Sequence, residues 1–213
     1  MLSRSLSRRQ GLAWLAAVPF MAAAAPAVAD APADPAQVTA PIRALNAELL
    51  RVMRAGKAVP FSQRAAMLTP AVDAAFDLRQ ILRVSVGPAW ERMTPAQRQA
   101  LLDVFRRYTV ASYVDNFDSF DGQHFDLTPT PRPVPGGAQV VLTKIVSRSG
   151  KAHQIDYVMR MTGTAWKAVD VLADGSISRV AVQRSDFSQL LEKGGAPALM
   201  ASLERKVKTL SHG

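Results

Sequence analysis

The sequence predicts an α+β fold in which helices wrap a curved antiparallel sheet of about four strands. Apolar residues recur at helical spacing from Pro41 to about Ser119. They then alternate over 124–172, as in half-buried strands, and helical spacing returns over 177–210. Because helices and strands are segregated along the chain, the α+β class is favoured over an alternating α/β fold. We expect a single domain over residues 41–210.

Residues 1–29 predict a cleaved signal peptide, so the protein is expected to be exported. A basic start containing Arg8 and Arg9 precedes the apolar run 11–25 and then Ala27-Val28-Ala29, the small-x-small pattern that signal peptidase cuts. The run is short for a membrane span, and a retained anchor is the alternative. Arg8-Arg9 also fits a twin-arginine signal, with ordinary secretion as the other route. Residues 30–40, rich in Ala and Pro, are expected to form a flexible N-terminal segment.

Charge and cysteine content narrow the classes of partner. The chain carries 26 basic and 17 acidic residues and no cysteine. Removing the leader's three arginines leaves 23 basic residues, a net charge of +6. An exported basic protein is expected to meet anionic lipid headgroups or an acidic partner surface and not nucleic acid, although a generally soluble surface is the simpler reading. Without disulfides, its stability must come from a buried core.

The helical part is expected to begin at Pro41 and to run to Gly56, which stops the first helix. Further helices are expected over 62–67, where Ser62 is the cap and Pro70 interrupts, over 72–86, and over 94–119. The N-terminus of the helix over 94–119 is the clearest of these, because Thr94 can cap it, Pro95 suits the first helical position, and Gln97 completes a capping box.

Strands are expected over 124–127, 138–148, 152–162 and 164–172, and the proline-rich stretch between the first two should be an extended loop or edge. Two helices, 177–193 and 197–210, should follow the turn at Asp174-Gly175-Ser176. A strongly curved sheet wrapped by helices makes a half-open cone whose interior is a natural apolar pocket.

Few residues are arranged for chemistry. No histidine pair has metal-ligand spacing, and Asp115, Asp118 and Asp121 lack the alternation of a calcium loop. Asp73 and Asp77 are better explained as a cap and a surface charge than as an acid/base pair. We therefore expect no catalytic residue, no metal and no cofactor.

Several motifs resemble, in order and spacing, those of the MlaC family of periplasmic phospholipid carriers, also called the toluene-tolerance auxiliary family. The motifs are Phe76-Asp77-Leu78 through Gly87-Pro88-Ala89-Trp90, Thr94-Pro95-Ala96-Gln97-Arg98, Phe105-Arg106-Arg107-Tyr108, Ile155-Asp156-Tyr157, Trp166 to Asp170, Asp186 to Leu191, and Gly195 to Leu203. The similarity covers residues 38–209. One departure, Asp174-Gly175-Ser176-Ile177-Ser178, is one residue longer than the family's usual Gly-Val-Ser region and looks like the hopanoid-biosynthesis-associated (HpnM-like) branch.

The resemblance implies a mixed fold similar to NTF2, a periplasmic location, no enzyme activity, and a lipid whose acyl chains lie inside while its headgroup stays outside. Phospholipid is the default ligand and a hopanoid is the alternative. The implied partners are an inner-membrane ABC-type lipid transporter with an MCE-domain subunit and an outer-membrane lipoprotein complex.

Apolar residues of the helices and strands are the expected lipid-binding lining of this pocket. From the helices they are Phe76, Ile81, Leu82, Trp90, Leu102, Phe105, Tyr108 and Tyr113, and from the sheet Val140, Leu142, Ile155, Tyr157, Met159, Val169 and Val171. An error of one residue in the strand register would invert the choice of face.

Two other functions remain open on the sequence alone. An NTF2-like enzyme would need a buried acid or base, and the only strand carboxylates to nominate are Asp156 and Asp170, which the alternation directs outward. A periplasmic adaptor would instead have a filled core and would bind a membrane complex through its basic surface.

Overall fold

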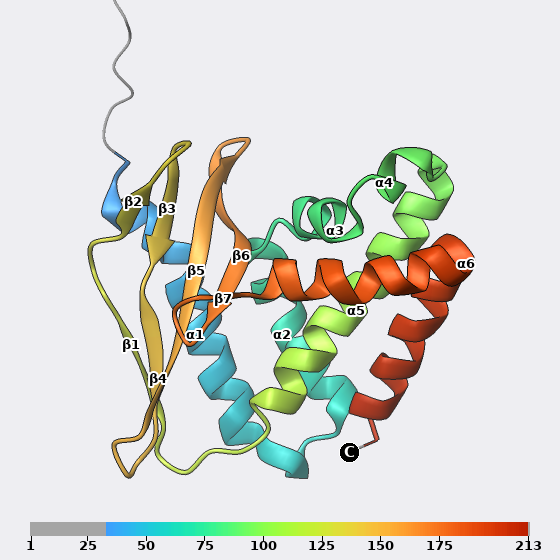
Figure 1. Ribbon diagram of the computed structural model, residues 1–213. Coiled ribbons are helices and arrows are strands. Elements are labelled where there is room, and N and C mark those ends of the chain that lie inside the picture. Colours follow the sequence, from blue (N-terminus) through green and yellow to red (C-terminus); the bar gives the residue numbers. More distant parts are fainter. Residues whose placement is uncertain (1–32, 213) are drawn as a thin grey trace, which may run out of the picture. The chain divides into compact units, whose positions relative to one another are not determined.

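The computed structural model describes residues 33–212, so the predicted signal peptide lies outside the described part of the chain. The helices are α1 Pro35–Ala55, the 3₁₀ turn η1 Gly56–Ala58, α2 Phe61–Ala75, α3 Leu78–Val86, α4 Ala89–Arg92, α5 Pro95–Asn116 and α6 Arg179–Leu210 (Figure 1). The strands are β1 His124–Leu127, β2 Arg132–Val134, β3 Ala138–Val141, β4 Thr143–Val146, β5 Ala152–Thr162, β6 Ala165–Ala173 and β7 Ile177–Ser178. The predicted α+β class is confirmed, with the sheet on one side and most helices on the other (Figure 1).

The first helix starts earlier than predicted. Asp34 is its N-cap, accepting a hydrogen bond from the Ala36 amide at 3.0 Å, and Pro35 occupies the first helical turn. Residues 35–40, expected to be flexible, are therefore helical, and Val38 and Thr39 are buried. The prediction took Pro41 as the helix start, but an equally suitable proline preceded by a better cap lies six residues upstream.

The next two helices also divide at a different place. Helix α2 begins after Pro60 and not at Ser62. It continues through Pro70, which has no amide hydrogen to bond the carbonyl four residues earlier. Pro70 is exposed, so water can reach that carbonyl. The break comes at Phe76, which is extended and bridges to Ala168 of β6. Asp77 donates its amide to the Ala168 carbonyl (2.9 Å) and caps α3 through its side chain. Pairing with the sheet thus ends α2.

Helix α5 begins with the predicted capping box. The Thr94 hydroxyl accepts from the Gln97 amide at 3.2 Å, and the Gln97 side chain accepts from the Thr94 amide at 2.9 Å. The helix ends at Asn116, slightly before the predicted Ser119.

The sheet has seven strands where about four were predicted, partly because the predicted second strand is interrupted. Strands β3 and β4 both pair with β5, at its C-terminal and N-terminal parts respectively, and are joined through Leu142. On the outer side of these two strands, β2 pairs with β3 and β1 pairs with β4. On the other side of β5, β6 pairs with residues Ile155 to Thr162. The predicted strand 138–148 is therefore two strands separated by a break.

A buried carboxylate occupies the break. The Thr143 amide donates to Asp156 Oδ1 at 3.1 Å, where a regular ladder would use a main-chain carbonyl, and Gln154 Nε2 donates to Asp156 Oδ2 at 2.7 Å. Asp156 is only 1% exposed, so it does not face solvent, but it points away from the face of Ile155 and Tyr157, as expected, and does not border the cleft. Its hydrogen bonds offset the cost of burying the charge.

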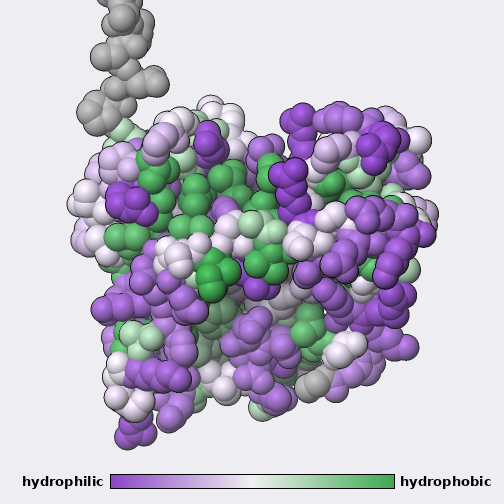
Figure 2. Space-filling model, viewed as in Figure 1, coloured by the Kyte–Doolittle hydropathy of each residue, from purple (hydrophilic) through white to green (hydrophobic). Residues whose placement is uncertain are grey.

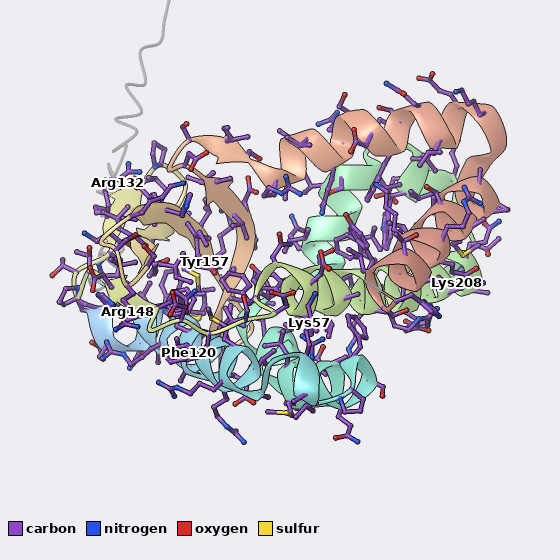
Figure 3. All side chains as sticks on the ribbon, turned by 90° about the horizontal axis from the view of Figure 1, so that it is seen from below. Lys57, Phe120, Arg132, Arg148, Tyr157 and Lys208 are labelled. Carbon is purple, nitrogen blue, oxygen red and sulfur yellow. The ribbon has the colours of Figure 1, made fainter. Side chains whose placement is uncertain are left out.

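Helix α6 contains both predicted C-terminal helices and bends sharply between them. Gly194 and Gly195 have non-helical backbone angles, and Gly195 has φ +62°, a left-handed conformation that glycine adopts without strain. After the bend, the second half of the helix returns along α5 (Figures 1 and 3).

The core lies between the helices and the inner face of the sheet. Ile42, Leu45 and Leu49 of α1 are fully buried there, and Leu68 of α2 and Leu101 of α5 complete it from the helical side. Over residues 33–212, no helix combines the length and apolar character that crossing a membrane requires.

Candidate functional site

A cleft of about 660 Å³ opens between the helices and the N-terminal half of β5. Its walls come from α1, the α2–α3 junction, α3, α5, the loop after α5, β4, β5, β6 and the first turns of α6. The lining residues are Met53, Phe76, Leu78, Ile81, Phe105, Tyr108, Thr109, Ser112, Tyr113, Asn116, Phe117, Ser119, Gln123, Ile145, Ser147, His153, Ile155, Asp170, Val171, Ala173, Arg179, Val180 and Gln183. The volume is in the range of sites that enclose small organic ligands, roughly 300–1,000 Å³.

Aromatic rings form one continuous wall of the cleft. The ring centres of Phe76 and Tyr113 are 5.7 Å apart. The Tyr113 ring stacks on the Phe117 ring, with 5.9 Å between the ring centres and an angle of 10° between the ring planes. Phe117 in turn contacts Phe125 of β1 at 6.0 Å. Such a chain of rings presents a large rigid apolar surface at a small cost in side-chain entropy.

Two tyrosines near this wall keep their protons at neutral pH. Burial raises the pKa of Tyr157 to about 12, with a further contribution from the Asp156 carboxylate, and burial raises the pKa of Tyr113 well above its ordinary value. Tyr157 lies between the sheet and the helices (Figure 3), and its hydroxyl has no hydrogen-bond partner among the described residues. The inner face of β5 at Tyr157 and the side of α5 at Tyr113 are therefore uncharged.

The rim of the cleft is polar. Ser112 and Asn116 lie on α5, Gln123 lies in the following loop, and Ser147 and His153 lie at the β4–β5 end of the sheet. Hydrophilic residues also surround the apolar residues on the face shown in Figure 2. An elongated ligand could thus keep a polar end near the rim and an apolar part further in.

Asp170 borders the cleft, contrary to the expectation that it points outward. Its Oδ1 accepts from the amides of Val171 (2.7 Å) and Val180 (3.1 Å), and its Oδ2 accepts from the Ser178 hydroxyl at 2.5 Å. The bonds from Ser178 and Val180 fasten the start of α6 to β6. Asp170 is thus held as a structural anchor of the cleft wall.

The structure brings together about half of the predicted lining. The predicted residues that border the cleft are Phe76, Ile81, Phe105, Tyr108, Tyr113, Ile155 and Val171. The others do not border it: Leu82, Trp90, Leu102, Val140, Leu142, Tyr157, Met159 and Val169.

Several of the misplaced residues belong to the filled core. Leu82, Tyr157 and Met159 have no exposed surface, and Trp90 packs in the same cluster with the Arg98 guanidinium 5.5 Å from its ring. Leu102 borders a separate hollow of about 250 Å³ that also contains the Asp73–Arg106 ion pair. Apolar spacing predicts burial for all of them but does not distinguish packed residues from lining residues.

The remaining predicted lining residues, Val140, Leu142 and Val169, do not border the cleft because of the alternation and irregularities of the strands. Val140 alternates with Val141, and it is Val141 that joins the main core. Leu142 lies in the break between β3 and β4. Val169 is the extra residue of a β-bulge, because Val158 pairs with Asp170 whereas Met159 pairs with Ala168.

The site also has a polar stripe, which was not among the predicted lining residues. Thr109, Ser112 and Asn116 follow Phe105 at spacings of three or four residues along α5, and all border the cleft. This spacing was visible in the sequence, but only apolar residues were considered. Within residues 33–212, no group of His, Asp or Glu side chains is arranged to hold a metal ion.

The fold and the cleft together define an α+β domain with an apolar internal cleft and a polar rim. The family model described as MlaC protein matches residues 43–205, and the chain belongs to the MlaC family. A solved structure with the same fold is a phospholipid-binding protein from Ralstonia solanacearum in complex with a phospholipid. It superimposes with a TM-score of 0.70 at 17% sequence identity, covering 82% of this chain and 99% of that one.

Proposed function

We propose that the protein binds a membrane lipid by inserting its hydrocarbon chains into the cleft. Phospholipid is the default ligand, and a hopanoid is the alternative suggested by the Asp174–Ser178 segment. The single observation that carries the proposal is the cleft itself, about 660 Å³ in volume, with a wall of aromatic rings from Phe76 to Phe117. Membership of the MlaC family and the phospholipid bound to the structural relative support it.

A cleft of this kind addresses the physical obstacle to moving lipids through water. Each methylene group exposed to water costs about 0.8 kcal/mol, so a lipid with two long acyl chains loses on the order of 20 kcal/mol when it leaves a membrane unaided. A carrier must offset most of that loss without exceeding it greatly, so that the lipid can be handed on again.

The lipid is proposed to be carried across the periplasm. The leader-like residues 1–29 and the basic composition support export and contact with anionic surfaces. The proposed partners are an inner-membrane ABC-type transporter with an MCE-domain subunit and an outer-membrane lipoprotein complex. We propose a binding role without a catalytic step, since Asp170 is engaged in three hydrogen bonds at the wall of the cleft. The cleft also favours a carrier over an adaptor, which requires no internal space.

The proposal is tested in two ways: the lipid bound to the purified protein is extracted and identified, and the cleft is blocked by a substitution. Val171→Trp adds a large side chain to the cleft wall and is expected to reduce bound lipid by at least about tenfold. Val84→Trp, at an exposed site on α3, is the matched control and should leave binding unchanged. Mass spectrometry of the extract quantifies and identifies the lipid. Lipid-free parent protein, or equal binding by Val171→Trp, would contradict the proposal.

A further inference from the structure

A second hollow of about 410 Å³ adjoins the cleft at the C-terminal half of α6. It shares Tyr108, Ser112, Asn116 and Arg179 with the cleft. Its remaining wall is made by Ser202, Arg205, Lys206, Thr209 and Leu210. The two spaces therefore meet along the polar stripe of α5.

The second hollow is positively charged. Arg179, Arg205 and Lys206 line it, and no carboxylate does. In the part of the chain that the structure describes, none of these three cations has a carboxylate oxygen within 4.0 Å, and the neighbouring Glu204 pairs with Arg107 instead. Three unneutralised cations around one space repel each other and attract an anion.

The neutral groups of the hollow suit the same kind of ligand. Hydroxyl groups of Tyr108, Ser202 and Thr209 line it together with the cations. The Lys206 ammonium lies over the Tyr108 ring, 5.7 Å from its centre, so the cation is held toward the cleft side of the hollow. Guanidinium, ammonium and hydroxyl groups are the donors that phosphate oxygens accept from.

The two spaces also have the right order along α5. Phe105 borders the cleft alone, and Tyr108, about 4.5 Å further along the helix, borders both spaces and lies beneath the Lys206 ammonium. A lipid with its chains against Phe105 and Phe76 would have its polar end where the wall changes from apolar to basic.

We propose that the basic hollow binds the negatively charged phosphate headgroup of the carried lipid. We also propose that the protein selects anionic lipids over zwitterionic ones, because the cationic end of a zwitterionic headgroup would be repelled by Arg179, Arg205 and Lys206. This inference rests on the proposed function, since it places the chains of the same lipid in the cleft. A neutral hopanoid would leave the three cations without a counter-charge.

The test compares lipid choice between two double variants of the full chain. Arg205→Gln with Lys206→Gln removes two cations from the hollow while keeping polar side chains of similar length. Lys193→Gln with Lys208→Gln is the matched control, because both residues are exposed on α6 and outside either hollow (Lys208 is labelled in Figure 3). Each protein is equilibrated with vesicles of equal phosphatidylglycerol and phosphatidylcholine content with identical acyl chains, separated from them, and its bound lipid is quantified.

The parent and the control are expected to hold about tenfold more phosphatidylglycerol than phosphatidylcholine, and the Arg205→Gln, Lys206→Gln variant is expected to lose that preference while binding the same total lipid. Equal binding of both lipids by the parent would overturn the headgroup site and leave the proposed function intact. The same loss of preference in the control would overturn it too, because the effect would then come from net charge alone. A parent that binds no lipid would overturn both proposals. Binding of free glycerol phosphate by that parent, measured by calorimetry, would assign the hollow to a soluble phosphate instead.

Discussion

The two ends of strand β5 have the same pattern in the sequence but different surroundings in the structure. Ile155, Tyr157 and Met159 alternate along one face of the strand. At the C-terminal end, Tyr157 and Met159 are fully buried against the core that includes α1. At the N-terminal end, Ile155 borders the cleft, as does Ile145 of β4, whose partner on β5 is His153. One end of the sheet is filled and the other is left open.

The difference arises from what covers each end of the sheet. The helix α1 packs on β3 and β6, whereas the space beyond the break at Leu142 is bounded mainly by α5 and the first turns of α6. We infer that the filled end supplies most of the folding free energy. The open end can then bind and release a ligand without putting the whole domain at risk of unfolding.

The largest expected effect is on stability, and it comes from comparing two side-chain truncations on the same face of β5. Met159→Ala removes a fully buried side chain and is expected to lower the free energy of unfolding by about 2–5 kcal/mol. Ile155→Ala removes a side chain that borders open space, so no comparable cavity is created, and the expected loss is about 1 kcal/mol. Urea unfolding of lipid-free protein measures both. Equal losses would mean that the two ends are packed alike.

An intermediate effect is expected at the wall of the open end. Asp170→Ala removes the acceptor of two hydrogen bonds from the start of α6 and one from Val171 of β6, and it should cost about 1–3 kcal/mol. Amide hydrogen exchange should become faster in the first turns of α6 and stay unchanged in α1. Asp186→Ala, on the exposed side of the same helix, is the control. If exchange were unaffected in Asp170→Ala, the carboxylate would not be the anchor of this wall.

The smallest effect at neutral pH is expected for Tyr157→Phe, because the buried hydroxyl has no partner to lose. The unfolding free energy should change by less than about 1 kcal/mol at pH 7. A difference should appear in alkali. The pKa of Tyr157 is raised to about 12 in the folded protein from an ordinary value of 10.0, so the unfolded state loses its proton first.

The parent protein should therefore lose stability as the pH rises from about 10 to about 12, by about 1.4 kcal/mol per pH unit from this group. Tyr157→Phe lacks this group and should show a shallower decline. Thermal unfolding at a series of pH values measures both slopes. Identical slopes would show that Tyr157 is not shielded from water in the folded state.

The sequence was sufficient for the fold class and for many element boundaries, because these follow from local patterns. The capping box at Thr94 and the alternation over 152–162 are examples in which every neighbouring residue favours the same structure. The end of α2 at Phe76 and the interruption of the strand at Leu142 could not be predicted in this way. Each depends on a contact with a strand far along the chain, Ala168 in the first case and Asp156 in the second.

The site was only partly predictable for a related reason. Hydrophobic spacing indicates that a side chain avoids water, but Met159 in the packed core and Ile155 at the cleft satisfy that requirement equally. Which of them faces open space depends on how far the covering helices lie from the sheet. The bulge at Val169 adds a second uncertainty, because it changes which residues of β6 face inward.

The bend at Gly194 and Gly195 links the two spaces through one helix. The segment before the bend supplies Arg179, Val180 and Gln183 to the cleft, and the segment after it supplies Arg205 and Lys206 to the basic hollow. Since each segment is a stiff rod, the angle at these glycines sets the interval between the apolar floor and the cations. For a lipid bound as we propose, this interval would set how far its charged headgroup lies from the apolar wall that holds its chains, and a residue inserted at the bend would change that distance.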